Sequence, residues 1–438
     1  MTSPPYHIEE LTPSGLGFSR DSSGKITLIE GVISGETVTA KIQSTGKKAD
    51  TGVATSILEP SRERIQAPCP SYRQCGGCDF QHMSYQCQLH EKYSIIRDIL
   101  LESNDPTLQE AAQKLLKQPL ASKKQIHYRQ RIRLQVDDNQ VLGFHKRRSH
   151  ACIAINNCLL AQPEINNCLQ ELLQQSPFAK LLRQTEAIEI LYDPNGSTIT
   201  IQIHFKRKPR PTDLKLAQNL IDTIPGIKNI FFTSTGFAVT GSDSLSFTLP
   251  PLAPHTEKSL QLSLETGGFC QVNVEQNTTL VKTVLDYCAI TKEETVLDLF
   301  CGMGNFAVPL AEQAKSVLGV EGQGSAIRSA KKNSSDAGQR NTSFKKQAIH
   351  AACLELAKSG TLFDIIILDP PRQGAPGLAR ILHTLCEKRL VYVSCDPVTL
   401  CRDLEELLHQ GFIVKRIQPI DMFPQTHHIE NVVLLEKV

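Results

Sequence analysis

The C-terminal part of the chain alternates short apolar strands with helical segments, and this pattern constrains the fold more than any other feature. The apolar runs are Thr295–Phe300, Val317–Glu321 and Phe363–Asp369, and helices are expected to begin at Asn305 and Ser325. Strands that are apolar almost throughout are buried on both faces, which is typical of a parallel sheet covered by helices. We therefore expect an α/β fold with a parallel sheet from about residue 266 onward.

Length and composition indicate a soluble globular chain with several domains. The 438 residues, 40% hydrophobic and 21% charged, fit about three domains of roughly 150 residues each. No apolar run approaches the roughly 18 residues of a membrane span, and no signal-peptide core follows Met1, so we expect a cytoplasmic protein. Fourteen cysteines in such a chain argue against a disulfide framework.

The two regions before residue 266 have different patterns. Residues 1–62 alternate short strands with turns and predict a small β-barrel, a fold that can bind single-stranded nucleic acid or be purely structural. Residues 63–265 combine a cysteine-rich loop, a basic strand and a hairpin around Asp193-Pro194-Asn195-Gly196. We expect an α+β domain there, followed by the α/β domain over 266–438.

Positive charge is concentrated in one segment although the net charge is only +2. Residues 121–150 contain eight Lys or Arg against two Asp. Arg129, Arg131 and Arg133 alternate, so a strand would place all three on one face, which suits a phosphate backbone. An ordinary solvated strand face is the alternative.

A glycine-rich turn follows the first strand of the expected α/β domain. It reads Cys301-Gly302-Met303-Gly304-Asn305-Phe306-Ala307, and Glu321 ends the next strand, where a carboxylate can bind both ribose hydroxyls. This pattern fits S-adenosylmethionine and NAD equally well, and a turn without a ligand is also possible.

Asp369-Pro370-Pro371-Arg372 ends the fourth strand and favours methyl transfer. It resembles a motif of amino-directed methyltransferases in which an aromatic residue, here replaced by Arg372, stacks on the target base. A methyl acceptor other than an exocyclic amine is therefore expected.

Cys395 ends the next strand and is the candidate nucleophile. A thiolate that adds to C6 of uracil makes C5 able to attack a sulfonium methyl group, and a base must then remove the C5 proton. Glu430 is the candidate base, since partial desolvation would raise its pKa from about 4.3. We expect Arg372 or Arg402 to favour the Cys395 thiolate. An inert buried thiol and a turn-capping acid are the alternatives.

Three cysteines in a loop rich in Pro and Gly form a candidate metal site. Their spacing, Cys69-x5-Cys75-x2-Cys78, suits zinc or an iron–sulfur cluster. A fourth ligand must come from farther along the chain, and Cys87, Cys152 and Cys158 are the candidates.

Four motifs together resemble the RNA (uracil-5-)-methyltransferase family. They are Leu297–Phe306, Asp369–Arg372, Val393–Leu400 and His428-Ile429-Glu430. The N-terminal barrel resembles an OB-like TRAM domain, and the cysteine loop matches the iron–sulfur loop of the ribosomal RNA branch. The transfer RNA branch lacks both features, so the resemblance implies 23S ribosomal RNA as substrate.

The resemblance also implies a role for each candidate residue. It implies a Rossmann-like class I methyltransferase domain in which Cys395 is the nucleophile and Glu430 the base. The positions implied to contact S-adenosylmethionine are Gln271, Phe300, Asn305, Glu321 and Asp369. The positions implied to hold a [4Fe-4S] cluster are Cys69, Cys75, Cys78 and Cys158.

Two positions depart from the family pattern. Asp396 stands where many members have Asn, and Ala348 stands where a polar residue often meets the adenine. Two other classes of protein compete with the methyltransferase interpretation. An NAD-dependent oxidoreductase gives no role to Cys395 with Glu430, and a non-catalytic RNA-binding module with a metal loop uses only the basic strand and the cysteines.

Overall fold

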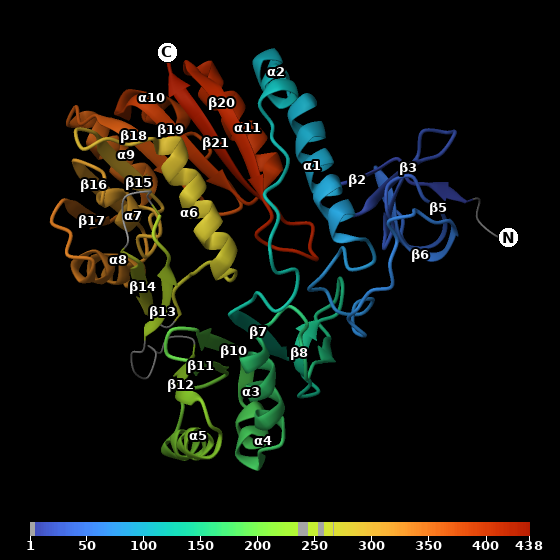
Figure 1. The fold of residues 1–438 in the computed structure, drawn as a ribbon. Coiled ribbons are helices and arrows are strands. Elements are labelled where there is room, and N and C mark those ends of the chain that lie inside the picture. The colour runs from blue at the N-terminus through green and yellow to red at the C-terminus, as the bar shows by residue number, and fades with distance from the viewer. Residues whose placement is uncertain (1–4, 235–243, 253–257, 266) are drawn as a thin grey trace.

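The computed structural model describes residues 5–234, 244–252, 258–265 and 267–438, which form three large sheets with their helices (Figure 1). The first four residues of the expected N-terminal domain and the expected boundary at residue 266 lie outside the described residues. The C-terminal sheet and the N-terminal sheet lie at the top of Figure 1, and the central sheet lies below them.

The N-terminal sheet has six strands in the order β1-β5-β6-β4-β3-β2. They are β1 (Tyr6–His7), β2 (Glu10–Leu11), β3 (Gly17–Arg20), β4 (Ile26–Glu30), β5 (Thr37–Ser44) and β6 (Ala49–Glu59). The predicted short strands in residues 1–62 are thus confirmed. Buried Ile29, Val32 and Val38 lie in the core on one side of this sheet.

The central sheet also has six strands, in the order β12-β11-β10-β7-β8-β9. They are β7 (Arg131–Val136), β8 (Leu142–His145), β9 (Cys152–Ala154), β10 (Thr185–Asp193), β11 (Thr198–Phe205) and β12 (Ile227–Thr233). Helices α3 (Pro163–Leu173), α4 (Ser176–Leu182) and α5 (Pro211–Thr223) accompany it. The predicted hairpin is β10 and β11, with Asp193 paired to Thr198.

The C-terminal sheet has seven strands in the order β17-β16-β15-β18-β19-β21-β20. They are β15 (Thr295–Leu299), β16 (Ser316–Glu321), β17 (Thr342–Lys346), β18 (Phe363–Leu368), β19 (Cys386–Ser394), β20 (Phe412–Ile420) and β21 (Glu430–Lys437). The strands from β17 to β19 are parallel, as predicted, whereas β21 pairs antiparallel with both β19 and β20.

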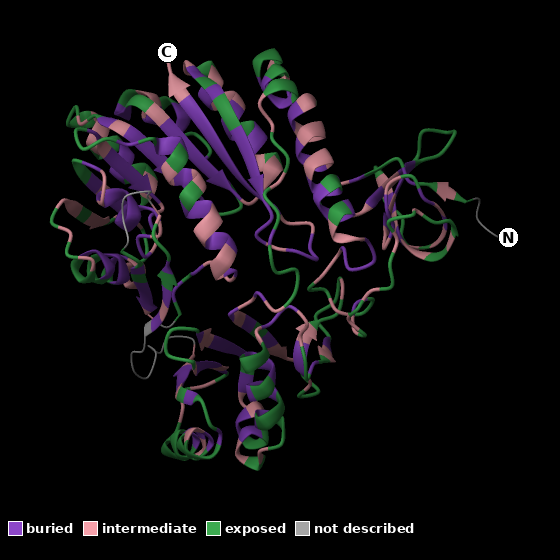
Figure 2. Ribbon diagram, in the orientation of Figure 1, coloured by how far each residue is buried: buried purple, intermediate pink, exposed green. Residues whose placement is uncertain are grey.

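Helices cover both faces of the C-terminal sheet, so its inner strands β15, β18 and β21 are buried over most of their length, whereas the edge strand β17 is not (Figure 2). The helices are α6 (Val274–Cys288), α7 (Ala307–Ala311), α8 (Gly324–Asp336), α9 (Ile349–Lys358), α10 (Ala379–Leu385) and α11 (Pro397–His409). One core contains Ile366, Leu390 and Leu404, and the other contains Val281, Val296 and Val391. This two-sided burial is the physical reason for the near-continuous apolar runs.

Two segments that we expected in the middle domain share the cores of the C-terminal sheet. Helices α1 (Tyr85–Leu101) and α2 (Pro106–Lys114) place Ile96, Leu100 and Leu108 in the same core as Ile366. The hairpin β13 (Ser244–Leu249) and β14 (Leu260–Glu265) contributes Phe247 and Leu262 to the other core. Parts of the expected middle domain therefore pack together with the C-terminal sheet.

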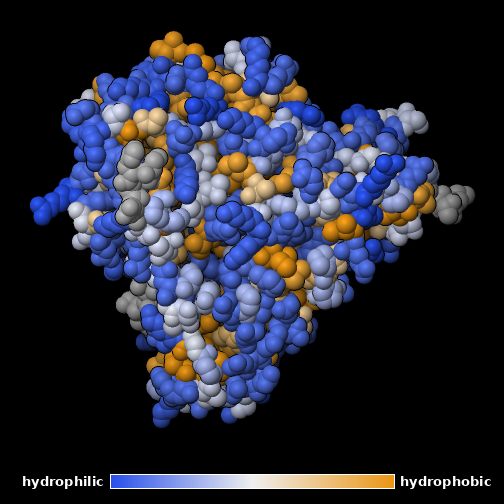
Figure 3. Space-filling model, in the orientation of Figure 1, coloured by the Kyte–Doolittle hydropathy of each residue, from blue (hydrophilic) through white to orange (hydrophobic). Residues whose placement is uncertain are grey.

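The molecular surface shown in Figure 3 is largely hydrophilic, with hydrophobic residues in small separate groups. Among the described residues, none of the helices has the length and apolar character required to span a membrane.

Candidate active site

Four of the predicted site residues lie at one edge of the C-terminal sheet. Phe300, Glu321, Asp369 and Cys395 end or directly follow β15, β16, β18 and β19, and parallel strands bring their carboxyl ends to the same edge. Glu430 reaches this edge from the opposite direction because β21 is antiparallel to β19. Ser394 pairs with Asn431, so the register places Glu430 beside Cys395.

The glycine turn after β15 has the backbone geometry of a ligand cradle. Phe300, Gly302 and Gly304 have φ values of 62°, 53° and 88°, and a positive φ is unusual for Phe. A Cβ on Gly304 would lie 2.8 Å from Cγ2 of Val308, so only glycine fits there. The Gly302 N–H donates to Glu321 (3.3 Å), which fixes this carboxylate at the mouth of the turn.

The remaining predicted cofactor residues lie beside this turn or near the start of α6. Asn305 and Asn277 of α6 exchange two side-chain hydrogen bonds of 2.8 and 2.9 Å. Gln271 is half-buried and lies two residues before Asn273, which caps α6. Ala348 is exposed at the N-cap of α9 and adds no polar group.

Cys395 opens into a cavity of about 220 Å³, which we call the catalytic cavity. Three distant parts of the chain line it, namely the turn before β3, helix α1 and the C-terminal sheet with its loops. The lining residues are Pro13, Ser14, Lys92, Ile95, Arg372, Cys395, Asp396, Pro397, His427, His428 and Ile429. A single planar base would fit a cavity of this size.

Burial raises the pKa values of the acid–base groups at this edge. The pKa of Glu430 is raised well above its ordinary value, by burial and then by Asp369. The pKa of Asp369 is raised to about 7 by burial. The pKa of Cys395 is raised to about 12, first by burial and then by Glu430, while Arg372 acts in the opposite direction. Glu430 thus has the desolvated environment that a base at neutral pH requires.

The expectation for the cation beside Cys395 is met by Arg372 only. Arg402 instead bonds Asp403 and the Gln373 carbonyl. Asp396 caps α11 by accepting from the N–H groups of Val398 (3.1 Å) and Thr399 (2.9 Å), which the carbonyl of an Asn can do equally well.

The sequence prediction missed three polar residues of this region. Asp298 in β15 is fully buried, no side chain of the described residues bonds its oxygens, and its pKa is raised well above the ordinary value by burial and by Asp369, against the effect of the Ala307 N–H. His428 accepts a 3.2 Å hydrogen bond from Arg372, and burial lowers its pKa to about 3. Lys92 is fully buried and binds Asp421 at 2.6 Å. For Asp298 the sequence did carry a signal, because an acid inside the apolar run of β15 indicates a buried carboxyl group.

The four predicted cluster cysteines line one cavity of about 50 Å³, which we call the thiol cavity. They are Cys69, Cys75, Cys78 and Cys158. The other two candidates lie elsewhere, because Cys152 faces the Gln135 carbonyl and Cys87 packs in the N-terminal core. Within the described part of the chain, no three His, Cys, Asp or Glu side chains converge closely enough to hold one metal ion.

Arg129 also lines the thiol cavity and is an unusual buried cation. Its Nε is buried without a hydrogen-bond partner. Burial raises the pKa of Cys78 to about 12 and also raises that of Cys75 and of Cys158, so these thiols do not supply the missing negative charge. A bound group that carries net negative charge on thiolate ligands would do so.

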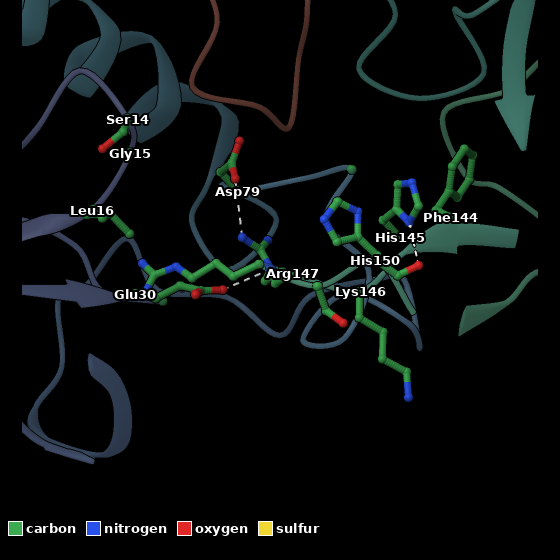
Figure 4. Close-up of a pocket in the computed structure, with 15 residues that line it drawn as sticks. Ser14, Gly15, Leu16, Glu30, Asp79, Phe144, His145, Lys146, Arg147 and His150 are labelled. Carbon is green, nitrogen blue, oxygen red and sulfur yellow. Dashed lines mark hydrogen bonds and ion pairs between the residues drawn. The ribbon is translucent and has the colours of Figure 1, made fainter. Parts of the chain in front are cut away.

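The basic segment is divided among ion pairs on β7, the thiol cavity and a groove. Arg131 and Arg133 lie on one face of β7, as predicted, but both pair with the buried carboxylate of Glu189. Arg129, which was predicted on the same strand face, precedes β7 and lines the thiol cavity instead. Lys146 and Arg148 are exposed and line a groove of about 750 Å³ between the N-terminal and central sheets (Figure 4). We call it the basic groove, and Ser14 lines both this groove and the catalytic cavity.

The strand order with one antiparallel strand, β21, the glycine turn and the acid at the end of β16 together define a class I S-adenosylmethionine-dependent methyltransferase. The chain belongs to the tRNA (uracil-5-)-methyltransferase family, whose family model matches residues 84–438. It is therefore an S-adenosylmethionine-dependent RNA (uracil-5-)-methyltransferase, and the NAD-dependent oxidoreductase and the non-catalytic module are excluded.

Its relatives match over nearly the whole length. A protein of Shewanella sediminis named 23S rRNA (uracil(1939)-C(5))-methyltransferase RlmD is 33% identical, with 98% of this chain and 95% of the relative covered. The protein of the same name from Vibrio parahaemolyticus is 30% identical, again with 98% and 95% covered.

A solved structure shares the whole fold. The Pyrococcus abyssi tRNA (uracil-54, C5)-methyltransferase in complex with S-adenosyl-L-homocysteine matches with a TM-score of 0.74 at 21% identity, over 98% of this chain and 99% of the other. Because 98% of this chain is covered, the match extends into the N-terminal region, so the presence of that fold region does not by itself separate the two branches. A protein whose title names transfer RNA has the same overall architecture.

Proposed function

We propose that this protein methylates C5 of a uridine in 23S ribosomal RNA, with Cys395 as nucleophile and Glu430 as base. The observation that carries the proposal is the β19–β21 register, which pairs Ser394 with Asn431 and so sets the desolvated carboxyl of Glu430 beside a thiol that lines the catalytic cavity. A thiol and a base together are what C5 methylation of uracil requires.

The proposed reaction assigns one step to each residue. The Cys395 sulfur adds to C6 of the uracil, which makes C5 nucleophilic. S-adenosylmethionine would supply the methyl group. Glu430 then takes the C5 proton, and expulsion of the Cys395 thiolate restores the C5–C6 double bond. The raised pKa of Glu430 suits it to hold that proton.

We further propose that the glycine turn and its neighbours hold S-adenosylmethionine. Glu321 keeps lone pairs for the ribose hydroxyls, because it accepts only backbone N–H bonds, from Gly302 and Gln323. Phe300, Asn305, Gln271 and Asp369 are the further proposed contacts. The positive φ values of the turn and the buried, unpartnered Asp298 support a ligand at this edge.

The choice of 23S ribosomal RNA rests on relatives at 30–33% identity whose names give that substrate. Their names specify uracil 1939, so we propose the corresponding uridine as the target. A transfer RNA uridine is the second candidate, favoured by the whole-chain likeness to the Pyrococcus abyssi structure.

The RNA is proposed to run along the basic groove into the catalytic cavity. Lys146 and Arg148 would contact phosphates there, and Ser14 lies where the groove meets the cavity. The target base must leave its stack to reach Cys395. We propose that the N-terminal sheet is an OB-like TRAM domain in contact with this RNA, and that the enzyme acts in the cytoplasm.

We also propose a [4Fe-4S] cluster in the thiol cavity. In such a cluster each cysteine binds a different iron, so the four sulfurs surround a volume and need not converge on one ion as they do around zinc. The net negative charge of the cluster with its thiolates would satisfy the buried Arg129. Its proposed role is to hold the loops of the central region in place.

The reaction is tested with S-adenosylmethionine and RNA fragments that carry 5-fluorouridine, which cannot lose a proton from C5. A covalent adduct should form with wild type and with Cys401→Ser, a buried-thiol control, but not with Cys395→Ser. Glu430→Gln should accumulate adduct on natural RNA. Normal turnover by Glu430→Gln would refute its role as the base.

The substrate is tested with 23S ribosomal RNA and transfer RNA offered separately, both from cells that lack the enzyme. Methylation of transfer RNA alone would overturn the ribosomal assignment. For the cluster, Cys78→Ala should lose iron and visible absorbance while Cys152→Ala keeps both. Zinc in place of iron in the anaerobically purified wild type would overturn the cluster.

A further inference from the structure

Asp79 lies where the cysteine loop meets the active site. It directly follows Cys78, and its carboxylate accepts from two parts of the chain, of which Figure 4 shows the contact with Arg147. One oxygen accepts from Arg147 at 3.2 Å, and the other accepts from Nδ1 and the backbone N–H of His427 at 2.7 and 3.2 Å. The side chain of Asp79 is 18% exposed, so water screens these bonds only partly.

The backbone around Asp79 strengthens this attachment. The N–H groups of Asp79 and Phe80 both donate to the Gln425 carbonyl, at 2.9 and 3.0 Å. Gln425 has a φ of 72°, so the turn that it forms is strained and depends on its surroundings to persist. The cysteine loop therefore holds both ends of the short segment Gln425–His427.

A chain of contacts continues from His427 to the reacting groups. The rings of His427 and His428 lie 4.0 Å apart between centroids, and His428 accepts from Arg372. Both histidines line the catalytic cavity with Cys395, and Glu430 follows His428 by two residues. A change in the position of His427 would therefore move His428, and with it Arg372 and the start of β21.

We propose that Asp79 is a positioning residue for methyl transfer, which fixes His427 and, through His428, sets Arg372 and Glu430 beside Cys395. This inference rests on the proposed function only for the roles of Cys395 and Glu430. Asp79 is not among the residues that line the catalytic cavity, so it acts on the reacting groups through the histidine pair.

The ion pair with Arg147 explains why residue 79 must be a carboxylate to hold His427 in place. Arg147 also binds Glu30 of β4 at 2.9 Å and the Cys78 carbonyl. Asp79 thus joins the N-terminal sheet, the loop after β8 and the segment that leads to β21. An amide at this position keeps the shape but loses the charge that attracts both Arg147 and His427.

The first test compares Asp79→Asn, His427→Gln and the double variant in methylation of total RNA from cells lacking the enzyme. We expect kcat to fall at least about tenfold in each single variant, with KM for both substrates nearly unchanged, because small misplacements of catalytic groups lower the rate strongly. The double variant should lose no more than either single one. Additive losses, or a rise in KM alone, would overturn the proposal.

Glu294→Gln is the matched control. Glu294 is also a buried carboxylate with two cationic partners, Arg389 at 2.5 Å and Lys388 at 3.1 Å, but it lies at the opposite edge of the C-terminal sheet. It should lose stability without losing kcat. A fall in kcat equal to that of Asp79→Asn would show a general effect of destabilisation and overturn the proposal.

The second test needs no RNA, so it separates this inference from the proposed function. Arg372 favours the Cys395 thiolate, so alkylation of Cys395 by iodoacetamide at pH 9 should be at least about threefold slower in Asp79→Asn and unchanged in Glu294→Gln. Equal rates in wild type and Asp79→Asn would refute the positioning role. If the variants separate but wild type methylates no RNA, the proposed function fails and the positioning role stands.

Discussion

At the scale of single residues, the candidate site is a set of buried carboxyl groups close to a thiol. Asp298, Asp369 and Glu430 all have raised pKa values, and each of the latter two raises the pKa of Cys395 further. The ligand-free protein therefore holds Cys395 mainly as a thiol. Positive charge that arrives with substrates would shift the balance toward the thiolate.

The first prediction concerns the pH dependence of Cys395 in the free protein. Only the thiolate reacts with iodoacetamide, and a pKa raised to about 12 means that the thiolate fraction still grows at alkaline pH. The alkylation rate should rise about tenfold per pH unit from pH 7 to 10 without a plateau. Mass spectrometry of the Cys395 peptide measures it, and a plateau below pH 9 would show a thiol with an ordinary pKa.

The second prediction concerns the buried Asp298. The pKa of Asp298 is higher in the folded state than in the unfolded state. The free energy of unfolding therefore falls as the pH rises from the unfolded-state pKa through the folded-state pKa. Asp298→Asn removes this penalty. It should stabilise the ligand-free protein by about 1 kcal/mol or more at pH 7, with a gain that disappears near pH 4.

Asp364→Asn is the control of opposite sign. Hydrogen bonds from Thr295 and from Lys388 lower the pKa of Asp364 against the effect of burial, so its carboxylate form stabilises the fold above the unfolded pKa. This variant should be less stable than wild type at pH 7. Thermal unfolding across pH 4–8 compares the two, and a loss of stability in Asp298→Asn at pH 7 would contradict the prediction.

The sequence predicted the site residues whose position follows from the end of a strand. It did not predict the residues whose role depends on side chains that pack against them from other elements. The thiol after β19 and the acid before β21 followed from the order of strands and motifs. The isolation of Asp298 and the bond from Arg372 to His428 depend on side chains that pack from other elements. No local pattern specifies such contacts.

At the scale of elements, the turn between β15 and α7 combines backbone strain with close packing. Phe300, Gly302 and Gly304 have positive φ, and Gly304 leaves no room for a side chain against Val308. The sequence predicted this turn because glycine spacing reports backbone geometry directly.

The third prediction separates these two constraints. Gly304→Ala should weaken S-adenosylmethionine binding at least about tenfold, because the added Cβ must displace Val308 as well as adopt a positive φ. Gly338→Ala has a φ of 76° but open space around it, so it carries only the backbone cost and should leave binding unchanged. Calorimetry measures both affinities. Equal losses in the two variants would show that packing against α7 is irrelevant.

The basic strand shows where element patterns fail. The alternation in β7 correctly placed Arg131 and Arg133 on one face, but the pattern could not reveal Glu189 on the neighbouring strand β10. A cross-strand partner 56 residues away from Arg133 offsets the positive charge of an apparent phosphate-binding face. Exposed cations without this partner lie beyond β8, at Lys146 and Arg148, where they line the basic groove.

At the scale of the whole molecule, the catalytic cavity is assembled from segments that lie far apart in sequence. Pro13 and Ser14 come from the N-terminal sheet region, Lys92 from α1, and Cys395 from the C-terminal sheet. Motifs predicted the chemistry of the last part only. The other walls result from packing between parts of the chain separated by some 300 residues, as in the contact of Lys92 with Asp421.

The fourth prediction tests this assembly through the buried pair of Lys92 and Asp421. Both side chains are fully buried, and the Lys92 ammonium also donates to the Phe423 carbonyl at 3.1 Å, which ties α1 to the segment before β21. Lys92→Met leaves a buried carboxylate without its cation. We expect a loss of about 3–5 kcal/mol in the free energy of unfolding, measured in urea, because removing one member of a buried pair exposes the other to the full desolvation penalty.

Two further variants decide whether the effect comes from the unpaired charge. Lys92→Met with Asp421→Asn should recover part of the loss, because the neutral amide is less costly to bury and Tyr85 remains within 2.9 Å of this position. Lys388→Met makes the same substitution in a pair whose lysine is 53% exposed, and it should cost less than about 1 kcal/mol. If the double variant is no more stable than Lys92→Met, lost packing accounts for the effect. If the double variant recovers part of the lost stability, the unpaired charge of Asp421 causes the loss. The contact of α1 with the segment before β21, which forms part of the catalytic cavity, then depends on electrostatic attraction between residues that no sequence motif connects.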